Sequence, residues 1–366
     1  MKMARRSRLV AGVCWVALLS APACSDDKSG ETPSAPDGGD ARPAGDGATV
    51  AEAGGDAGPD AAAPADAVAD GGDVAAGITA VMYLPDSLAN QIYRYTIAPG
   101  VDPVLTATIP LDKAAGAALR STGELFVASY TNTGIISRFL APAGTPVANG
   151  TIMGLGIAFP QEMRFVDDEL WVLNTADHAC TTEPQSIVRV AFDAQGAASA
   201  AGTITPGLIG ANRGLLWVPA TRELFVSQCH PVNALQHYRV ASDHSVTVLP
   251  AITGNGLHNP HAMVLTPWGE LLVVNAYDND ILRFTVDAQG AATANGTLVE
   301  NGMNLPVGMA FAPWGELFVI SQGMATVSRF SFDAAHVATA SGKFDTNTPV
   351  IAQQYGIAWV VIAPAP

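Results

Sequence analysis

The sequence predicts an all-β fold: a six-bladed β-propeller preceded by an export signal and a disordered acidic tether. Three observations predict it. The N-terminus is basic and then apolar, residues 25–78 contain no aromatic side chain, and a pattern of short apolar runs recurs through residues 79–366. The expected organisation is therefore a signal peptide at 1–23, a tether at 24–78 and the propeller at 79–366.

The first element has the layout of an export signal. Positive residues at 2, 5, 6 and 8 precede an apolar run at 9–19, small residues follow at 20–23, and then comes Cys24. This order of charge, apolar run and small residues is typical of secretory signals. The apolar run is about half of the ~20 residues that a membrane-spanning helix needs.

The cysteine at the cleavage point makes this segment resemble a bacterial lipoprotein signal. The resemblance implies that Cys24 receives lipid and becomes the mature N-terminus, with the membrane as a partner through that anchor. Ser25 at the next position implies the outer membrane, on its periplasmic or its exposed side. Ordinary secretion with an incidental cysteine is the alternative.

The segment 25–78 consists mainly of Asp, Ala, Gly and Pro, and it holds twelve acidic residues against Lys28 and Arg42. Too little apolar area is present to offset the entropy of ordering, so we expect a disordered, extended tether. The whole chain carries a net charge of −15, and the part after the tether is also acidic. This balance argues against nucleic acid as a partner, because phosphate binding needs a basic surface.

Residues 79–366 contain six copies of one repeat. Five copies open with a glutamate before an apolar run, and the sixth has Ala80 at that place. The glutamates are Glu124, Glu169, Glu223, Glu270 and Glu316. A second apolar stretch in each copy carries an arginine: Arg94, Arg138, Arg189, Arg239, Arg283 and Arg329. An antiparallel hairpin would bring each glutamate close to its arginine, so we interpret these pairs as structural; Arg94 needs another partner.

Each copy predicts four short strands separated by turn residues, which is the content of a propeller blade. The N-terminal copy begins with its second strand at 81–84, and the C-terminus from Tyr355 supplies a lone first strand. Joining the two ends gives six complete blades. The C-terminal strand is therefore expected to close the ring and to cover the exposed sheet edges.

The repeat P-x-G-M-A-F-x-P-W-G-E-L-F-V followed by x-R-F is clearest at 306–330 and 260–284. These residues resemble the NHL-repeat and SMP-30/gluconolactonase-like propellers, a group that includes lactonases, lyases and binding proteins. The resemblance covers 79–366 and implies a fold rather than a reaction. Its enzymes use a metal held by Glu, Asn and Asp, and their early Glu-Gly-Pro motif does not occur here.

The irregular loops of three consecutive repeats gather on one predicted face, where function usually concentrates. Imidazoles with a nearby carboxylate suit a divalent metal ion, and the predicted ligands are His230, His258, His261 and Asp278. The alternative is that these loop histidines bond to the backbone and shape turns. Further candidate residues of this ligand face are Asn174, His178 and Asn275.

Cys180 and Cys229 occupy equivalent loops of neighbouring repeats on this face. In an oxidising compartment such cysteines most often form a disulfide, which is the prediction. Joint metal ligation with the histidines and two unlinked thiols are the alternatives.

The sequence contains no G-x-S-x-G, P-loop or H-E-x-x-H motif, and it assigns no catalytic residue. The first hypothesis is a lipid-anchored extracytoplasmic binding module that presents the irregular face to a protein or small-molecule ligand. The alternative is a metal-dependent hydrolase, lactonase or lyase of the SMP-30/gluconolactonase-like type, with a divalent metal ion at the histidine-rich face.

Overall fold

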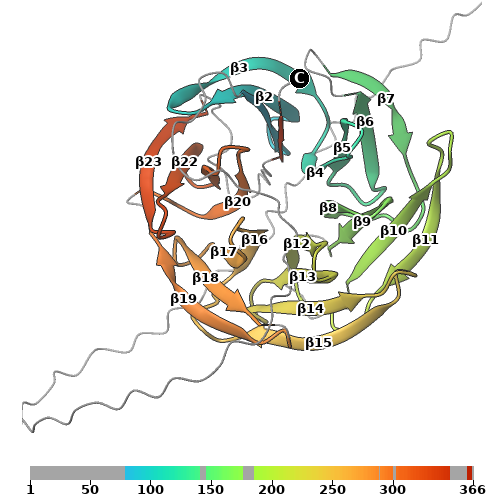
Figure 1. The fold of residues 1–366 in the computed structure, drawn as a ribbon. Coiled ribbons are helices and arrows are strands. Elements are labelled where there is room, and N and C mark those ends of the chain that lie inside the picture. The colour runs from blue at the N-terminus through green and yellow to red at the C-terminus, as the bar shows by residue number, and fades with distance from the viewer. Residues whose placement is uncertain are drawn as a thin grey trace, which may run out of the picture. The chain divides into compact units, whose positions relative to one another are not determined.

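The computed structural model describes residues 79–140, 146–175, 185–287, 289–299, 302–346 and 361–364. Their strands form six four-stranded antiparallel sheets, which Figure 1 shows arranged as blades around a common centre. The predicted all-β six-bladed propeller is confirmed. No helix in these segments is long and apolar enough to cross a membrane.

Each blade runs from an inner strand to an outer one, and blade 1 takes its inner strand from the C-terminal part of the chain. The inner strands are β24 (Val361–Pro364), β4 (Ala114–Leu119), β8 (Pro160–Val166), β12 (Asn212–Val218), β16 (Pro260–Leu265) and β20 (Pro306–Phe311). The second strands are β1 (Ala80–Asp86), β5 (Glu124–Ser129), β9 (Glu169–Asn174), β13 (Glu223–Gln228), β17 (Glu270–Asn275) and β21 (Leu317–Ser321).

The third strands are β2 (Gln91–Ala98), β6 (Ile135–Leu140), β10 (Ser186–Phe192), β14 (Ala234–Val240), β18 (Asp280–Val286) and β22 (Thr326–Phe332). The outer strands are β3 (Val101–Pro110), β7 (Val147–Ile152), β11 (Ala198–Ile204), β15 (Val246–Thr253), β19 (Ala292–Leu298) and β23 (Ala338–Asp345). The second strands are the apolar runs of the repeat, and they are almost wholly buried because each packs between two neighbouring blades.

The repeated glutamates and arginines form one ion pair in each of blades 2 to 6, which we call the blade pairs. Their closest nitrogen–oxygen distances are 2.8 Å for Glu124–Arg138, 2.8 Å for Glu169–Arg189, 2.8 Å for Glu223–Arg239, 2.5 Å for Glu270–Arg283 and 2.9 Å for Glu316–Arg329. The structural interpretation of these residues is supported. In blade 1, Arg94 donates instead to the Thr106 hydroxyl at 2.6 Å.

The strand register corrects two positions in the predicted repeat. Arg94 lies opposite Tyr83, as Arg138 lies opposite Phe126, so Val81 rather than Ala80 stands at the glutamate position. In blade 4 the residue opposite the equivalent Phe225 is His237, whereas Arg239 lies opposite Glu223 itself. In blade 4 the apolar pattern alone could not separate the alternatives, because His237 and Arg239 lie on the same strand and on the same face, two positions apart.

Several repeat arginines also join their blade to the next one. Nη1 of Arg138 donates to the Gly196 carbonyl at 2.8 Å, and Nη1 of Arg329 donates to the Val101 carbonyl at 3.2 Å. His237 replaces that arginine in blade 4, and its ring packs against the turn of blade 5. A Cβ on Gly290 would lie only 2.7 Å from the His237 Cε1, so that turn needs glycine.

Candidate functional site

The loops of the predicted ligand face are held by amide side chains at the ends of the second strands. The Asn174 Oδ1 accepts from the Ala158 N–H at 3.2 Å, and its Nδ2 donates to the Gly156 carbonyl at 2.8 Å. Asn275 repeats the arrangement two blades further on, accepting from the His258 N–H at 2.6 Å. Both asparagines are buried, so their amides position loop backbone.

His258 and Asp278 form a contact on this face. The His258 Nδ1 lies 2.9 Å from the Asp278 Oδ1, and the other carboxylate oxygen accepts from the Asn275 Nδ2 at 3.0 Å. The His258 ring also packs edge-on against Tyr277, with ring centroids 5.1 Å apart. These contacts orient the imidazole, and both partners remain well exposed to solvent.

The other two predicted metal ligands lie in different local settings. His230 is half-buried in the turn between β13 and β14, and His261 follows the first residue of β16. Within the described segments, no three His, Cys, Asp or Glu side chains are grouped so that they could hold a metal ion. Ligation of one ion by His230, His258, His261 and Asp278 thus stays a prediction, of which the structure supplies only the His258–Asp278 contact.

The predicted disulfide involves one residue outside the described segments. Cys180 and the neighbouring candidate His178 both fall there. Cys229 is buried at the end of blade 4's second strand, and its backbone carbonyl accepts from the Val232 N–H at 3.0 Å within the following turn. The pairing of Cys180 with Cys229 stays a prediction.

The inner strands lie around the centre of the ring (Figure 1), and a second group of polar residues belongs to them. The pairing of each inner strand from β4 to β20 with its second strand is irregular near the start of the inner strand. At these irregular places three consecutive blades carry polar residues, whereas β4 and β20 carry Ala115 and Val307. We call this group the central cluster: Gln161, Glu162, Arg164, Asn212, Arg213 and His261.

Glu162 is the buried acid of the central cluster, with an exposed fraction of 1%. It forms an ion pair with Arg164, and its Oε2 accepts from the Leu215 N–H of the next blade at 2.7 Å. Burial raises the pKa of Glu162 to about 7, although the Arg164 charge and the Leu215 N–H oppose the shift. This carboxyl group can therefore gain or lose a proton near neutral pH.

Two further members of the central cluster, Arg213 on β12 and His261 on β16, come from the next two blades. The Arg213 Nη1 donates to the Gln161 Oε1 at 3.4 Å. Loss of hydration and then the positive charge of Arg213 hold the pKa of His261 well below its usual value, so the imidazole is neutral at pH 7. A Cβ on Gly214 would lie 2.3 Å from the His261 carbonyl oxygen, so glycine is what lets β12 approach β16 this closely.

Asn212 completes the central cluster. Its side chain is fully buried, and neither of its amide atoms has a hydrogen-bond partner among the described residues. Buried amides are normally satisfied, so an unsatisfied one calls for an explanation such as a bound water or ligand.

Only His261 of the central cluster was among the sequence-based candidates. The useful signal was the first three residues of each inner strand, where the aligned repeats read Pro-Gln-Glu, Asn-Arg-Gly, Pro-His-Ala and Pro-Val-Gly. Polar residues there stand out only after the inner strands have been placed around a common centre.

The fold places this chain in the class of six-bladed β-propellers. No protein-family model matches the sequence, and no curated protein matches it. Among solved structures it is similar to the periplasmic gluconolactonase of Pseudomonas aeruginosa, at 13% identity and a TM-score of 0.60, covering 79% of this chain and 100% of that one.

Two further solved structures are similar in the same way. A candidate 6-phosphogluconolactonase of Bacteroides fragilis has 13% identity and a TM-score of 0.56, with 78% of this chain and 98% of that chain covered. A protein from Lactobacillus plantarum has 16% identity and a TM-score of 0.55, with 73% and 83% covered. At such identities the likeness shows the fold alone, and it does not carry an activity.

Proposed function

We propose that this protein is a lipid-anchored extracytoplasmic propeller that binds a small polar ligand at the central cluster. One observation carries the proposal: β8, β12 and β16 place buried or half-buried polar side chains at the centre of the ring, while β4 and β20 place small or apolar ones there. Burying polar groups is costly, so a cluster confined to three of these five strands is more easily explained by a ligand than by the fold.

The blade pairs show what a purely structural polar device looks like in this molecule. They recur in five blades, and Glu316 for example accepts from Arg329, Trp314 and Ser341. The central cluster does not recur in every blade, and it leaves both amide atoms of Asn212 without a hydrogen-bond partner among the described residues. This contrast supports a role in binding.

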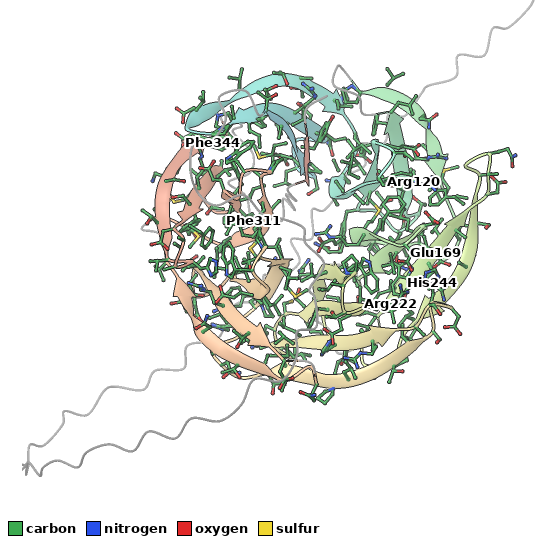
Figure 2. All side chains as sticks on the ribbon, viewed as in Figure 1. Arg120, Glu169, Arg222, His244, Phe311 and Phe344 are labelled. Carbon is green, nitrogen blue, oxygen red and sulfur yellow. The ribbon has the colours of Figure 1, made fainter. Side chains whose placement is uncertain are left out.

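The test is a thermal-shift screen of the full-length protein against water-soluble metabolites. We expect compounds that raise the melting temperature of the wild type and fail to do so when Arg213→Gln and His261→Ala are combined. Arg222→Gln is the matched control, because Arg222 lies away from the centre (Figure 2). Hits that persist unchanged in the double variant would place the binding site elsewhere.

The second candidate function is a hydrolase, lactonase or lyase, acting at the central cluster or, in a metal-dependent form, at the histidine-rich face. The pKa of Glu162 near 7 favours it, because a general acid or base works best when its pKa is close to the working pH. A metal-dependent form would draw on His258 and Asp278, and the metal content of the purified protein, measured for the wild type and for His258→Ala, tests it. Equal metal content in both would remove these residues from the hypothesis.

The membrane anchor and the tether are part of the proposal. Cys24→Ser should abolish incorporation of a fatty-acid label and release the protein from the membrane fraction. Limited proteolysis of the mature protein should cut within 25–78 and leave a core that begins near residue 79. Label retained by Cys24→Ser, or protection of 25–78, would contradict these two expectations.

We also infer that the C-terminal strand closes the ring. β24 pairs antiparallel with β1, with Tyr83 opposite Val361 and Ala80 opposite Pro364, which supports the inference. Removal of residues 354–366 would expose a strand edge and apolar surface, so the protein should aggregate or unfold without cooperativity. An unchanged melting temperature of the truncated protein would refute closure.

A further inference from the structure

We infer that the ligand of the central cluster carries an anionic oxygen group, a carboxylate or a phosphate, which Arg213 and Arg164 receive. This inference rests on the proposed function and adds the chemical class of the ligand. It follows from the depth at which each charge lies, from the balance of charge in the cluster and from the geometry of guanidinium groups.

The depth of the side chains comes first. Gln161, Glu162 and Asn212 are buried, with exposed fractions of at most 1%. The Arg164 side chain is 26% exposed, and Arg213 and His261 are half-buried. The two guanidinium groups and the neutral imidazole are therefore the members of the cluster that solvent reaches, whereas the Glu162 carboxyl group is shielded from it.

The balance of charge points the same way. The described cluster holds two guanidinium groups and one carboxyl group, in a chain whose net charge is −15. A positive centre in an acidic protein needs a reason, and attraction of an anionic ligand is one. The planar fork of arginine matches carboxylate and phosphate oxygens with two parallel hydrogen bonds. The neutral His261 can add a hydrogen bond without adding charge.

Ionisation of Glu162 works against such a ligand, which gives the inference a pH signature. The charged group that acts on Glu162 is Arg164 on its own strand, and His261 on β16, which lies near Arg213 of β12, is neutral. Neighbouring β4 contributes no titratable residue, and Glu169 of β9 is held by Arg189. Protonation of Glu162 below pH 7 removes the one negative charge, so anion affinity should rise between pH 8 and pH 6.

The experiment uses isothermal titration calorimetry on the full-length protein with matched pairs of probes. The pairs are succinate and succinamide, lactate and lactamide, and glycerol 3-phosphate and glycerol. We expect an anionic member to bind and its neutral partner to fail, and the carboxylate and phosphate pairs identify which oxygen group is preferred. Affinity should increase several-fold from pH 8 to pH 6, while glycerol 3-phosphate is compared at pH 8 and 7.2 to limit its own titration.

Substitutions test which residues bind the anion and which one causes the pH dependence. Arg213→Gln should weaken anion binding by about tenfold or more, the usual cost of losing a charged hydrogen bond. Arg213→Lys should give an intermediate loss, since it keeps the charge and loses the fork. Glu162→Gln should remove the pH dependence and retain binding, and Arg222→Gln should behave as wild type. Unchanged far-UV circular dichroism and cooperative unfolding show that each variant is folded.

Three outcomes would overturn the inference. Neutral members that bind as tightly as anionic ones, with no effect of Arg213→Gln, would refute the anionic class and leave the proposed binding function standing. Anion binding that survives Arg213→Gln would place the anion elsewhere. The anionic class would also be refuted if every probe failed to bind and the metabolite screen yielded only neutral compounds whose effect is lost in the double variant. A screen in which no compound depends on the central cluster would refute the proposed function itself.

Discussion

Glu162 at the centre of the ring and Glu270 in blade 5 are both buried glutamates that face an arginine, yet their pKa values shift in opposite directions. At Glu270 burial again favours the neutral form, but the Trp268 indole, Arg283 and Asn295 together outweigh it and lower the pKa. At Glu162 one guanidinium group and one backbone N–H do not outweigh burial, and the pKa rises to about 7.

The difference lies in how many donors the surroundings supply. The blade supplies enough donors to keep its carboxylate ionised, so the Glu270 pair stabilises the fold. The centre supplies too few, so Glu162 is held in an environment that costs stability at neutral pH. Residues placed where they cost stability are the ones that a binding or catalytic role best explains.

The largest expected effect comes from removing a fully satisfied blade pair. Glu316→Ala leaves the Arg329 guanidinium charged and buried, since the two side chains are only 8% and 5% exposed. Loss of one partner of a buried pair costs about 3–5 kcal/mol in the free energy of unfolding. Urea denaturation measures it, with Glu316→Gln as the milder comparison. A loss below about 1 kcal/mol would show that the blade pairs contribute little.

The next effect is the pH dependence caused by Glu162. Its folded pKa lies above the unfolded value, so the folded state holds the proton more tightly and stability falls as pH rises from about 4.5 to about 7. The size is on the order of 3 kcal/mol. The lowered pKa values of Glu169 and Glu270 give the opposite slope, because their contribution is lost as pH falls through the folded pKa.

The lowered pKa of His237 likewise removes stability below about pH 6.5, since the unfolded state then takes up the proton. The quantity to measure is therefore the difference between wild type and Glu162→Gln, by urea denaturation from pH 5 to pH 8. The variant should gain relative to wild type as pH rises. A difference that stays constant across this range would contradict the raised pKa.

The blades and the centre of the ring also differ in how well the sequence predicts them. The blades could be predicted because their pattern repeats, so that Glu124 and Arg138 could be compared with four other pairs along the same chain. The substitution of His237 for arginine was missed, because Arg239 lies two residues later on the same face and satisfies the pattern equally well. Register is decided by cross-strand pairing, which the sequence does not contain.

The central cluster could not be predicted for a related reason. Gln161, Arg213 and His261 come from three consecutive blades, and only the packing of their inner strands against one another brings them side by side. Apart from His261, the candidates chosen from the sequence lie outside the central cluster, and the structure shows that Asn174 and Asn275 hold loop backbone. Function on a repeat fold is carried by departures from the repeat, and those are visible only against a correct alignment of the inner strands.

Blade 1 offers a smaller test, because it has Val81 at the position where the other blades have the glutamate that pairs with the arginine. Arg94 donates to Thr106 at 2.6 Å, and that hydroxyl donates back to the Arg94 carbonyl at 3.1 Å. Thr106→Val keeps the shape and removes both bonds, so unfolding should become easier by about 1 kcal/mol. Thermal denaturation followed by circular dichroism measures it. A loss as large as that of Glu316→Ala would mean that Thr106 fully replaces a carboxylate.

The smallest effect is expected at the seam between blades 3 and 4. Arg222 lies 3.0 Å from Asp167, but the two side chains are 33% and 42% exposed, and Figure 2 shows Arg222 away from the centre of the ring. Exposed pairs contribute about 0–1 kcal/mol, because solvent screens the charges and ordering two long side chains costs entropy.

Arg222 also donates to the Val240 and Ala241 carbonyls, at 3.0 and 2.9 Å, which glutamine reaches less well. Arg222→Gln should therefore lower the free energy of unfolding by no more than Thr106→Val does. In 0.5 M salt the difference in this free energy between the variant and the wild type should become smaller. A loss that salt leaves unchanged would show that the backbone bonds, and not the charge, are what Arg222 contributes.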